Sequence, residues 1–195
     1  MQLSPERITD AALAILAEYG LGDVSMRRVA AALGVAPGAL YWHIANKQEL
    51  IASMAQAIVQ PLFDDSVPDP AVLSARLREV TLGVRDGAEV LVAAVGQPGS
   101  PVREALSHRF EEAVEAFAAE TADGQVAGDH IRAVALGLLH LTIGEAAVHQ
   151  SSAQLAELTG LPGGADDADA AAAQQAHARA VEYLLDGMVV RAATH

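Results

Sequence analysis

The chain has 195 residues, a formal net charge of −13, and a composition that is 52% hydrophobic and 19% charged. Its 42 alanines favour helices and argue against a β-sandwich or barrel, and the hydrophobic content excludes a disordered chain. The absence of cysteine excludes disulfides, thiolate metal sites and a cysteine nucleophile. The first residues lack the pattern of a signal peptide, and no run of ~18 apolar residues occurs. We therefore expect an all-α, cytoplasmic protein with no membrane partner.

Four helical segments are predicted in the first 60 residues. The first spans 5–19 and is capped by Ser4, and the second runs from Ser25 to Leu33. After a turn that contains Gly34, a third begins at Pro37 and reaches about residue 44, and Asn46 caps a fourth. This spacing is that of a helix-turn-helix, and a small helical bundle without any role at DNA would show it equally well.

The rest of the chain reads as a linker followed by further helices. Residues 61–70 hold three prolines and three aspartates and are predicted to link two domains, 1–60 and 61–195. The remaining helices are expected over 72–84, 88–95, 102–121, 129 to about 154 and 171–192, which gives about nine to ten in all. Apolar residues nearly encircle the helix that starts at 129, so we expect it to be buried in a core or a subunit interface. Residues 160–170 read as a loop.

The segment LYWHIANK at 40–47, directly after VAAALGVAPGA, resembles the DNA-binding domain of the TetR family of transcriptional regulators. The resemblance covers about residues 8–58. RDGAEV at 85–90 and HLTIGEAAVHQ at 140–150 resemble the tetracycline-repressor branch more weakly. The family implies a three-helix helix-turn-helix domain followed by a helical domain for ligand binding and dimerisation. It also implies a regulator, most often a repressor, that a small-molecule inducer releases from a palindromic double-stranded DNA operator.

The resemblance and the side-chain chemistry together predict the DNA contacts. Arg suits bidentate contact with guanine, small apolar residues suit a thymine methyl group, and Lys, aromatic tips and a helix cap suit phosphates. Arg28 could equally be an ordinary surface charge, and Leu40 and Tyr41 cannot both face the groove. The predicted DNA-binding residues are Ser25, Arg27, Arg28, Pro37, Gly38, Ala39, Tyr41, Trp42, His43 and Lys47.

The net charge is unevenly distributed. Residues 1–60 hold four basic and five acidic side chains, a net charge of −1, whereas residues 61–195 carry −12. No acidic residue lies between Asp23 and Glu49, although three basic residues do. Whole-chain charge argues against nucleic acid, but the predicted DNA face is locally basic, and its few cations predict a shallow salt dependence.

The second domain is expected to form a homodimer through its last two long helices, joined as a four-helix bundle. Polar residues on apolar helices are candidate ligand contacts, although each could be a satisfied core or interface group. The predicted pocket residues are Leu91, His108, Arg109, Phe110, Phe117, Leu138, Thr142 and Glu145, with His140 as a further polar candidate. No cofactor or metal site is predicted, and the effector is an unidentified small molecule.

Leu91 stands where the tetracycline-repressor branch carries its metal-binding histidine, and leucine cannot ligate Mg²⁺. We therefore predict an inducer other than Mg-tetracycline. An enzyme is not expected, because the chain lacks the GxSxG, P-loop, GxGxxG and HExxH motifs. The alternatives kept are a transcriptional activator of the same fold and a helical scaffold without DNA binding.

Overall fold

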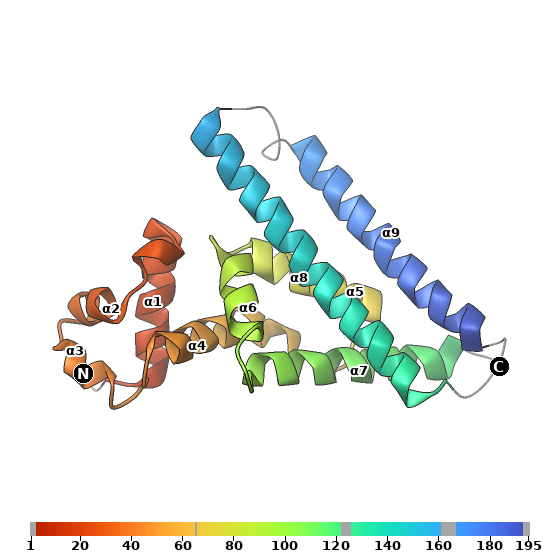
Figure 1. Ribbon diagram of the computed structural model, residues 1–195, viewed down its shortest axis with the longest axis horizontal. Coiled ribbons are helices and arrows are strands. Elements are labelled where there is room, and N and C mark those ends of the chain that lie inside the picture. The colour runs from red at the N-terminus through yellow and green to blue at the C-terminus, as the bar shows by residue number, and fades with distance from the viewer. Residues whose placement is uncertain (1–2, 65, 122–125, 161–166, 193–195) are drawn as a thin grey trace. The chain divides into compact units, whose positions relative to one another are not determined.

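The computed structural model describes residues 3–64, 66–121, 126–160 and 167–192, in which nine α-helices and two 3-10 helices account for all the regular structure. The all-α class is therefore confirmed. The chain forms two compact units. Figure 1 shows the helices coloured by residue number, from the N-terminus to the C-terminus. The first unit joins residues 1–60 to 80–103, and the second joins 61–79 to 104–195.

Most helices lie where the sequence predicts them. In chain order they are α1 (Pro5–Tyr19), η1 (Leu21–Asp23), α2 (Met26–Leu33), α3 (Pro37–Leu40), α4 (Lys47–Val59), η2 (Gln60–Leu62), α5 (Pro70–Leu82), α6 (Gly87–Val95), α7 (Pro101–Thr121), α8 (Gly128–Thr159) and α9 (Asp167–Ala192).

Three helix ends differ from the prediction by four residues or more. Helix α3 ends at Leu40 rather than near residue 44, because the chain turns there and then extends at Asn46 to cap α4. Helix α8 continues to Thr159. Helix α9 begins at Asp167, inside the predicted loop, since an aspartate in the first turn favours a helix N-terminus. Residues 161–166 of that loop lie outside the described part of the chain.

The core of the first unit forms where α1, α2 and α4 pack together and α6 packs on α4. Ile8, Leu16, Leu50 and Met54 are fully buried there, as are several residues of α6. Burying each of these large side chains contributes about 1.5–3 kcal/mol. The two residues before α6 also hold the first unit together: Arg85 donates to the carbonyl of Glu18 at 2.9 Å, and the Asp86 carboxylate accepts from the Leu21 amide at 2.7 Å.

These contacts explain why residues 80–103 belong to the same compact unit as residues 1–60. The boundary at residue 60 was predicted from the composition of the linker, which cannot reveal a segment that returns to the first unit. A functional division into 1–60 and 61–195 stays a prediction.

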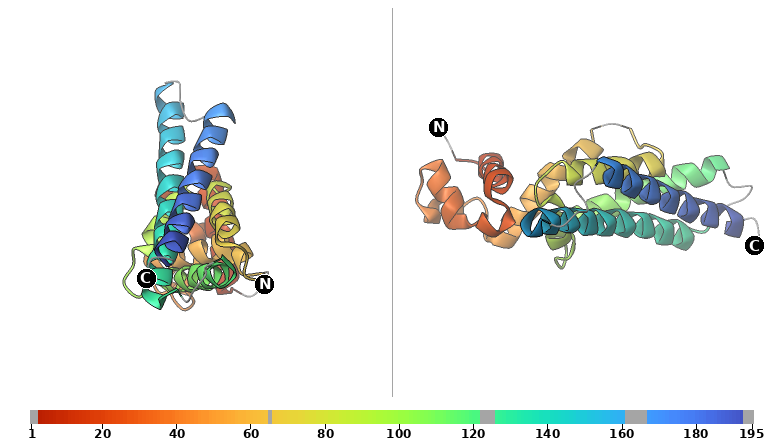
Figure 2. Two further views of the ribbon diagram at one scale, coloured as in Figure 1. Left: turned by 90° about the vertical axis from the view of Figure 1, so that its right-hand side faces the viewer. Right: turned by 90° about the horizontal axis from the view of Figure 1, so that it is seen from above.

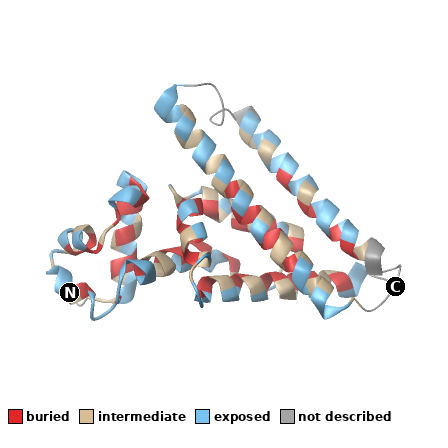
Figure 3. Cartoon of the chain, viewed as in Figure 1, coloured by how far each residue is buried: buried red, intermediate tan, exposed pale blue. Residues whose placement is uncertain are grey.

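In the second unit α8 and α9 lie side by side and run in opposite directions (Figures 1 and 2). Their facing sides carry buried stripes (Figure 3), with Leu138 and Thr142 on α8 and Val181 and Leu185 on α9. The buried residues of α8 lie on one face of the helix, from Ala135 to Ala146, whereas Val148 and Leu158 are exposed. Among the described helices α8 alone is long and apolar enough to span a membrane, a property that core helices of soluble proteins share.

Candidate functional site

Two short helices and a tight turn form the predicted helix-turn-helix. The Ser25 hydroxyl caps α2 by accepting a hydrogen bond from the Arg28 amide at 3.2 Å. Gly34 ends α2 in the left-handed region, at φ 68°, where glycine has no steric penalty. Pro37 then starts α3 at its first position. The sequence predicted each of these local signals, and the two helices and the turn form where it placed them.

The residues that follow α3 alternate sharply between core and surface. Leu40 and Ile44 are 0% and 1% exposed, whereas Trp42 is 89% exposed and Tyr41 is 53% exposed. Large aromatic side chains are rarely left this open in a folded chain, since each could remove 150–250 Å² from water. The sequence left open which of these two neighbours faces outward. In the structure Leu40 belongs to the core and Tyr41 faces outward.

Other predicted DNA contacts lie around these two aromatics on the chain's surface. Pro37, Gly38, His43 and Lys47 are exposed, and Ala39 is half-buried. Lys47 is the first residue of α4, whose N-terminus is capped by Asn46. Its ammonium group therefore adds to the partial positive charge of the helix end, an arrangement that suits a phosphate.

The two arginines of α2 have different environments. Arg27 is exposed. Arg28 forms an ion pair with Asp23, and its guanidinium lies 3.9 Å from the centre of the Tyr19 ring. A hydrogen bond to Glu18 and the charge of that carboxylate raise the pKa of Tyr19, and Arg28 opposes that change. Arg28 therefore has partners within its own unit, which is compatible with the alternative interpretation that it is an ordinary surface charge.

This helix-turn-helix segment is similar to that of known proteins. The model of the bacterial regulatory proteins of the tetR family matches residues 8–54, the segment that contains the helix-turn-helix. The class A tetracycline repressor from transposon 1721 of Escherichia coli is 31% identical over 151 residues, which cover 73% of this chain and 65% of that repressor. The chain belongs to the tetR family.

Two solved structures of tetR-like fold extend the likeness along the whole chain. Mycobacterium smegmatis BioQ is 29% identical, with a TM-score of 0.78 over 97% of this chain and 99% of that one. BioQ bound to its natural double-stranded DNA operator is 27% identical, with a TM-score of 0.75 over 96% and 99% of the two chains. The resemblance inferred from LYWHIANK is therefore confirmed at the level of the family.

In this tetR-family chain, most of the polar residues predicted to bind a ligand have partners within the fold. Arg109 is 8% exposed, and it donates to the carbonyls of Leu62 and Ser66, each at 3.1 Å. The Thr142 hydroxyl donates to the carbonyl of Leu138 at 2.8 Å. These contacts match the alternative interpretation of satisfied core groups, and a ligand role for these residues stays a prediction.

The other candidates of the predicted pocket differ in burial and in place. His108 is exposed beside Glu112, with 3.5 Å between Nδ1 and Oε1, and His140 is exposed on α8. Phe110 is fully buried and Phe117 is half-buried on α7. Leu91 is fully buried in the first compact unit, whereas the remaining candidates belong to the second.

Sequence reasoning named Glu145 of this tetR-family chain as a ligand candidate but missed its partners in a polar cluster of the second unit. Arg78 of α5 binds Glu145 of α8 through two hydrogen bonds, at 2.7 Å and 3.1 Å. His177 of α9 is 5% exposed, and both charged groups act on it electrostatically. The one available signal was the position of His177, four and eight residues before the apolar Val181 and Leu185, which places it in the buried stripe of α9.

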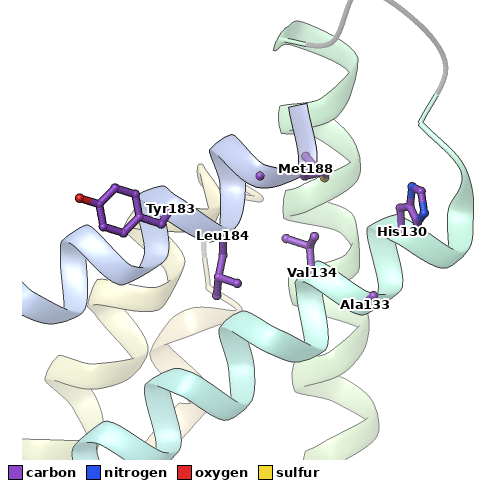
Figure 4. A pocket seen from close by; sticks show the side chains of 7 residues that line it. His130, Ala133, Val134, Tyr183, Leu184 and Met188 are labelled. Atoms are coloured by element: carbon purple, nitrogen blue, oxygen red, sulfur yellow. The ribbon is translucent and has the colours of Figure 1, made fainter. Parts of the chain in front are cut away.

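An apolar groove also lies between α8 and α9. It encloses about 290 Å³, and Val134 and Leu184 point into it from the two helices (Figure 4). Its remaining lining residues are His130, Ala133, Tyr183, Gly187 and Met188. Tyr183 is 74% exposed at its edge, so apolar surface of both helices stays open to solvent in the single chain.

Proposed function

We propose that this chain is a DNA-binding transcriptional regulator that binds a double-stranded operator through α2, α3 and the residues up to Lys47. The observation that carries the proposal is the outward display of Tyr41 and Trp42 beside the fully buried Leu40. Aromatic side chains with polar tips can pack against sugars and donate hydrogen bonds to phosphates. A structural role in the core would instead require them to be buried.

The charge pattern and the relatives support the same proposal. No acidic side chain lies between Asp23 and Glu49, so the exposed Arg27 and Lys47 belong to a segment whose charged side chains are all basic. BioQ, similar in fold and sequence, has been solved on its DNA operator. The small residues at the start of α3 would let its backbone approach base edges, where a thymine methyl group is the matching apolar contact.

We also propose that the regulator acts as a homodimer through α8 and α9. The exposed Val148, Leu158 and Tyr183 leave apolar surface on both helices that the single chain does not cover. Covering it with the same surface of a second copy would remove it from water and pair two DNA-binding units for a palindromic site. Alanine and glycine along α8 permit close approach of a partner helix.

Sedimentation equilibrium of Leu184→Asp tests the dimer. Leu184 points into the groove between α8 and α9, so a buried carboxylate there would weaken a dimer formed over this face. Val92→Asp is the matched control, because Val92 is an exposed apolar residue of α6 in the other compact unit. A wild-type monomer at micromolar concentration, or equal effects of both variants, would contradict the proposal.

The regulator is proposed to be a cytoplasmic repressor that a small molecule releases from DNA. The class A relative, 31% identical, is named a tetracycline repressor protein. The inducer proposed here is not Mg-tetracycline, because the fully buried Leu91 offers neither oxygen nor nitrogen to a metal ion. The predicted ligand residues of the second unit stand as candidates for its contacts.

A gel-shift assay with DNA from upstream of the chain's own gene and of the adjacent divergent gene tests DNA binding, and a reporter assay tests its sign. A repressor lowers reporter expression, whereas the alternative activator raises it. A helical scaffold without DNA binding, the second alternative, would shift neither fragment, and that outcome would overturn the proposed function.

A further inference from the structure

A buried histidine lies next to an ion pair in the second unit. His177 is 5% exposed, and among the described residues neither of its ring nitrogens has a hydrogen-bond partner. A neutral imidazole carries one donor and one acceptor, and leaving such a group unsatisfied costs about 1–3 kcal/mol. The packing of α9 against α8 therefore retains a polar group that an apolar residue would replace at lower cost.

The charged groups that act on His177 come from two other helices. Glu145 projects from α8 and Arg78 from α5, and the Glu145 oxygens are both engaged by the Arg78 guanidinium. Burial lowers the pKa of His177, the Glu145 carboxylate opposes that change, and Arg78 reinforces it. The half-buried His149, one helical turn beyond Glu145, is the next titratable group along α8.

The position of His177 connects its charge to the packing of α9. Val181, Leu185 and Met188 continue the same buried stripe toward the end of α9. The two helices approach closely beside this stripe, since a Cβ placed on Gly137 of α8 would lie 4.0 Å from a methyl carbon of Leu184 at the edge of the contact. A charge at His177 would therefore form inside the helix–helix contact and not at its edge.

We propose that His177 is a proton-sensitive joint: protonation of its imidazole releases α9 from α8. The docked helix excludes the proton, whereas an undocked helix exposes the imidazole to water. As the pH falls below the ordinary histidine value of 6.5, the undocked state gains a proton that the docked state resists. Acid therefore shifts the equilibrium toward the undocked helix, and at neutral pH the uncharged imidazole leaves it docked.

The size of the effect follows from proton linkage. Between pH 7.5 and pH 5.5, a group of ordinary pKa that is fully excluded from the docked state raises the undocked-to-docked ratio by up to about tenfold per subunit. The consequence for DNA binding rests on the proposed dimer, because α9 belongs to the proposed dimer surface. The joint itself can be tested without that assumption.

Two variants separate His177 from other titrating groups. His177→Met removes both ring nitrogens while keeping an apolar side chain that packs flexibly, and His140→Gln is the matched control, since His140 is exposed on α8. Chemical denaturation is measured for both and for the wild type at pH 7.5 and pH 5.5. On acidification from pH 7.5 to pH 5.5, the folding equilibrium constants of the wild type and of the control should fall by a factor up to about tenfold larger than that of His177→Met. An equal loss in all three proteins would overturn the proposal.

Hydrogen exchange and NMR titration locate the effect. At pH 5.5 the amides of α9 should exchange faster in the wild type than in His177→Met, compared at the same pH, and this difference should vanish at pH 7.5. If the variant fails to fold, titration of the wild-type histidine resonances decides, and a midpoint for His177 at or above that of His140 would overturn the joint. Sedimentation at both pH values is a separate readout: a monomer at pH 7.5 would contradict the dimer and leave the stability test of His177 standing.

Discussion

The carboxylate of Asp86 accepts a hydrogen bond from the backbone amide of Leu21 at 2.7 Å, across 65 residues of sequence. Asp86 sits in the left-handed region, at φ 54°, which an aspartate tolerates better than most residues. We predict that Asp86→Ala lowers the free energy of unfolding by about 1–3 kcal/mol, because it leaves a partly buried amide without its acceptor. Urea denaturation measures the loss.

Asp86→Asn is the control for that prediction. Asparagine keeps a side-chain oxygen that can accept from Leu21 and also tolerates the left-handed backbone, so its loss should be the smaller of the two. Equal losses in both variants would show that the negative charge matters, and not the hydrogen bond.

Trp42→Ala should separate DNA binding from folding. The side chain is 89% exposed, so its removal should change the free energy of unfolding by less than about 0.5 kcal/mol. Operator affinity should fall by about 1 kcal/mol or more, as expected for the loss of an ordered contact. Fluorescence anisotropy with a labelled operator and thermal unfolding give the two numbers, and unchanged affinity would remove Trp42 from the proposed interface.

The salt dependence of operator binding should be shallow. The proposed face offers few cations, and one of them, Arg28, is already paired with Asp23. The slope of log affinity against log salt concentration should therefore be less steep than about −9 per dimer, which corresponds to ten released counterions. Anisotropy titrations between low and moderate salt measure the slope, and a steeper value would mean that phosphate contacts extend beyond this face.

Mg-tetracycline should not bind tightly. Leu91 provides no ligand atom, and its side chain is fully buried. Calorimetry with tetracycline, with and without Mg²⁺, should show no magnesium-dependent heat, while the class A tetracycline repressor serves as a positive control in the same buffer. Tight binding that needs Mg²⁺ would refute the prediction and call for other metal ligands in this chain.

Gly87→Ala should destabilise the first unit. A Cβ at this position would lie 2.3 Å from the carbonyl oxygen of Thr81, so the backbone must shift, at a cost of about 1–3 kcal/mol. Gly38→Ala is the matched control, because no described atom outside its chain neighbours and helix backbone lies within 4 Å of the added atom, and alanine favours a helix. Thermal unfolding compares the two, and similar midpoints would mean that the Gly87 contact relaxes easily.

The helix-turn-helix was predictable because its signals are local. Ser25 and Asn46 cap the helices that follow them, and Pro37 opens α3 as its position indicates. The exposure of Trp42 was inferred from the family resemblance, and the structure agrees with it. The end of α3 was predicted four residues too late, because a short turn into the next cap has no strong sequence signal.

The polar contacts of the second unit were not predictable in the same way. Arg109 was a candidate ligand residue by its type and its place on an apolar helix, yet its guanidinium binds two backbone carbonyls more than 40 residues earlier in the chain. Arg78 and Glu145 are 67 residues apart, and no spacing rule relates them. The partner of a long polar side chain depends on which helices meet, and the sequence does not state that.

The sequence by itself determined the helical class and the helices of the first 60 residues, because helix propensity and caps depend on neighbouring residues. It also determined the concentration of acidic charge after residue 60, and the resemblance carried by LYWHIANK identified the helix-turn-helix. Only the tertiary structure decided that residues 80–103 belong with the first unit, and that His177 lies buried without a partner among the described residues. Both facts arise from packing between segments far apart in the chain. Such packing fixes desolvation and hydrogen-bond partners, and with them the chemistry open to each side chain.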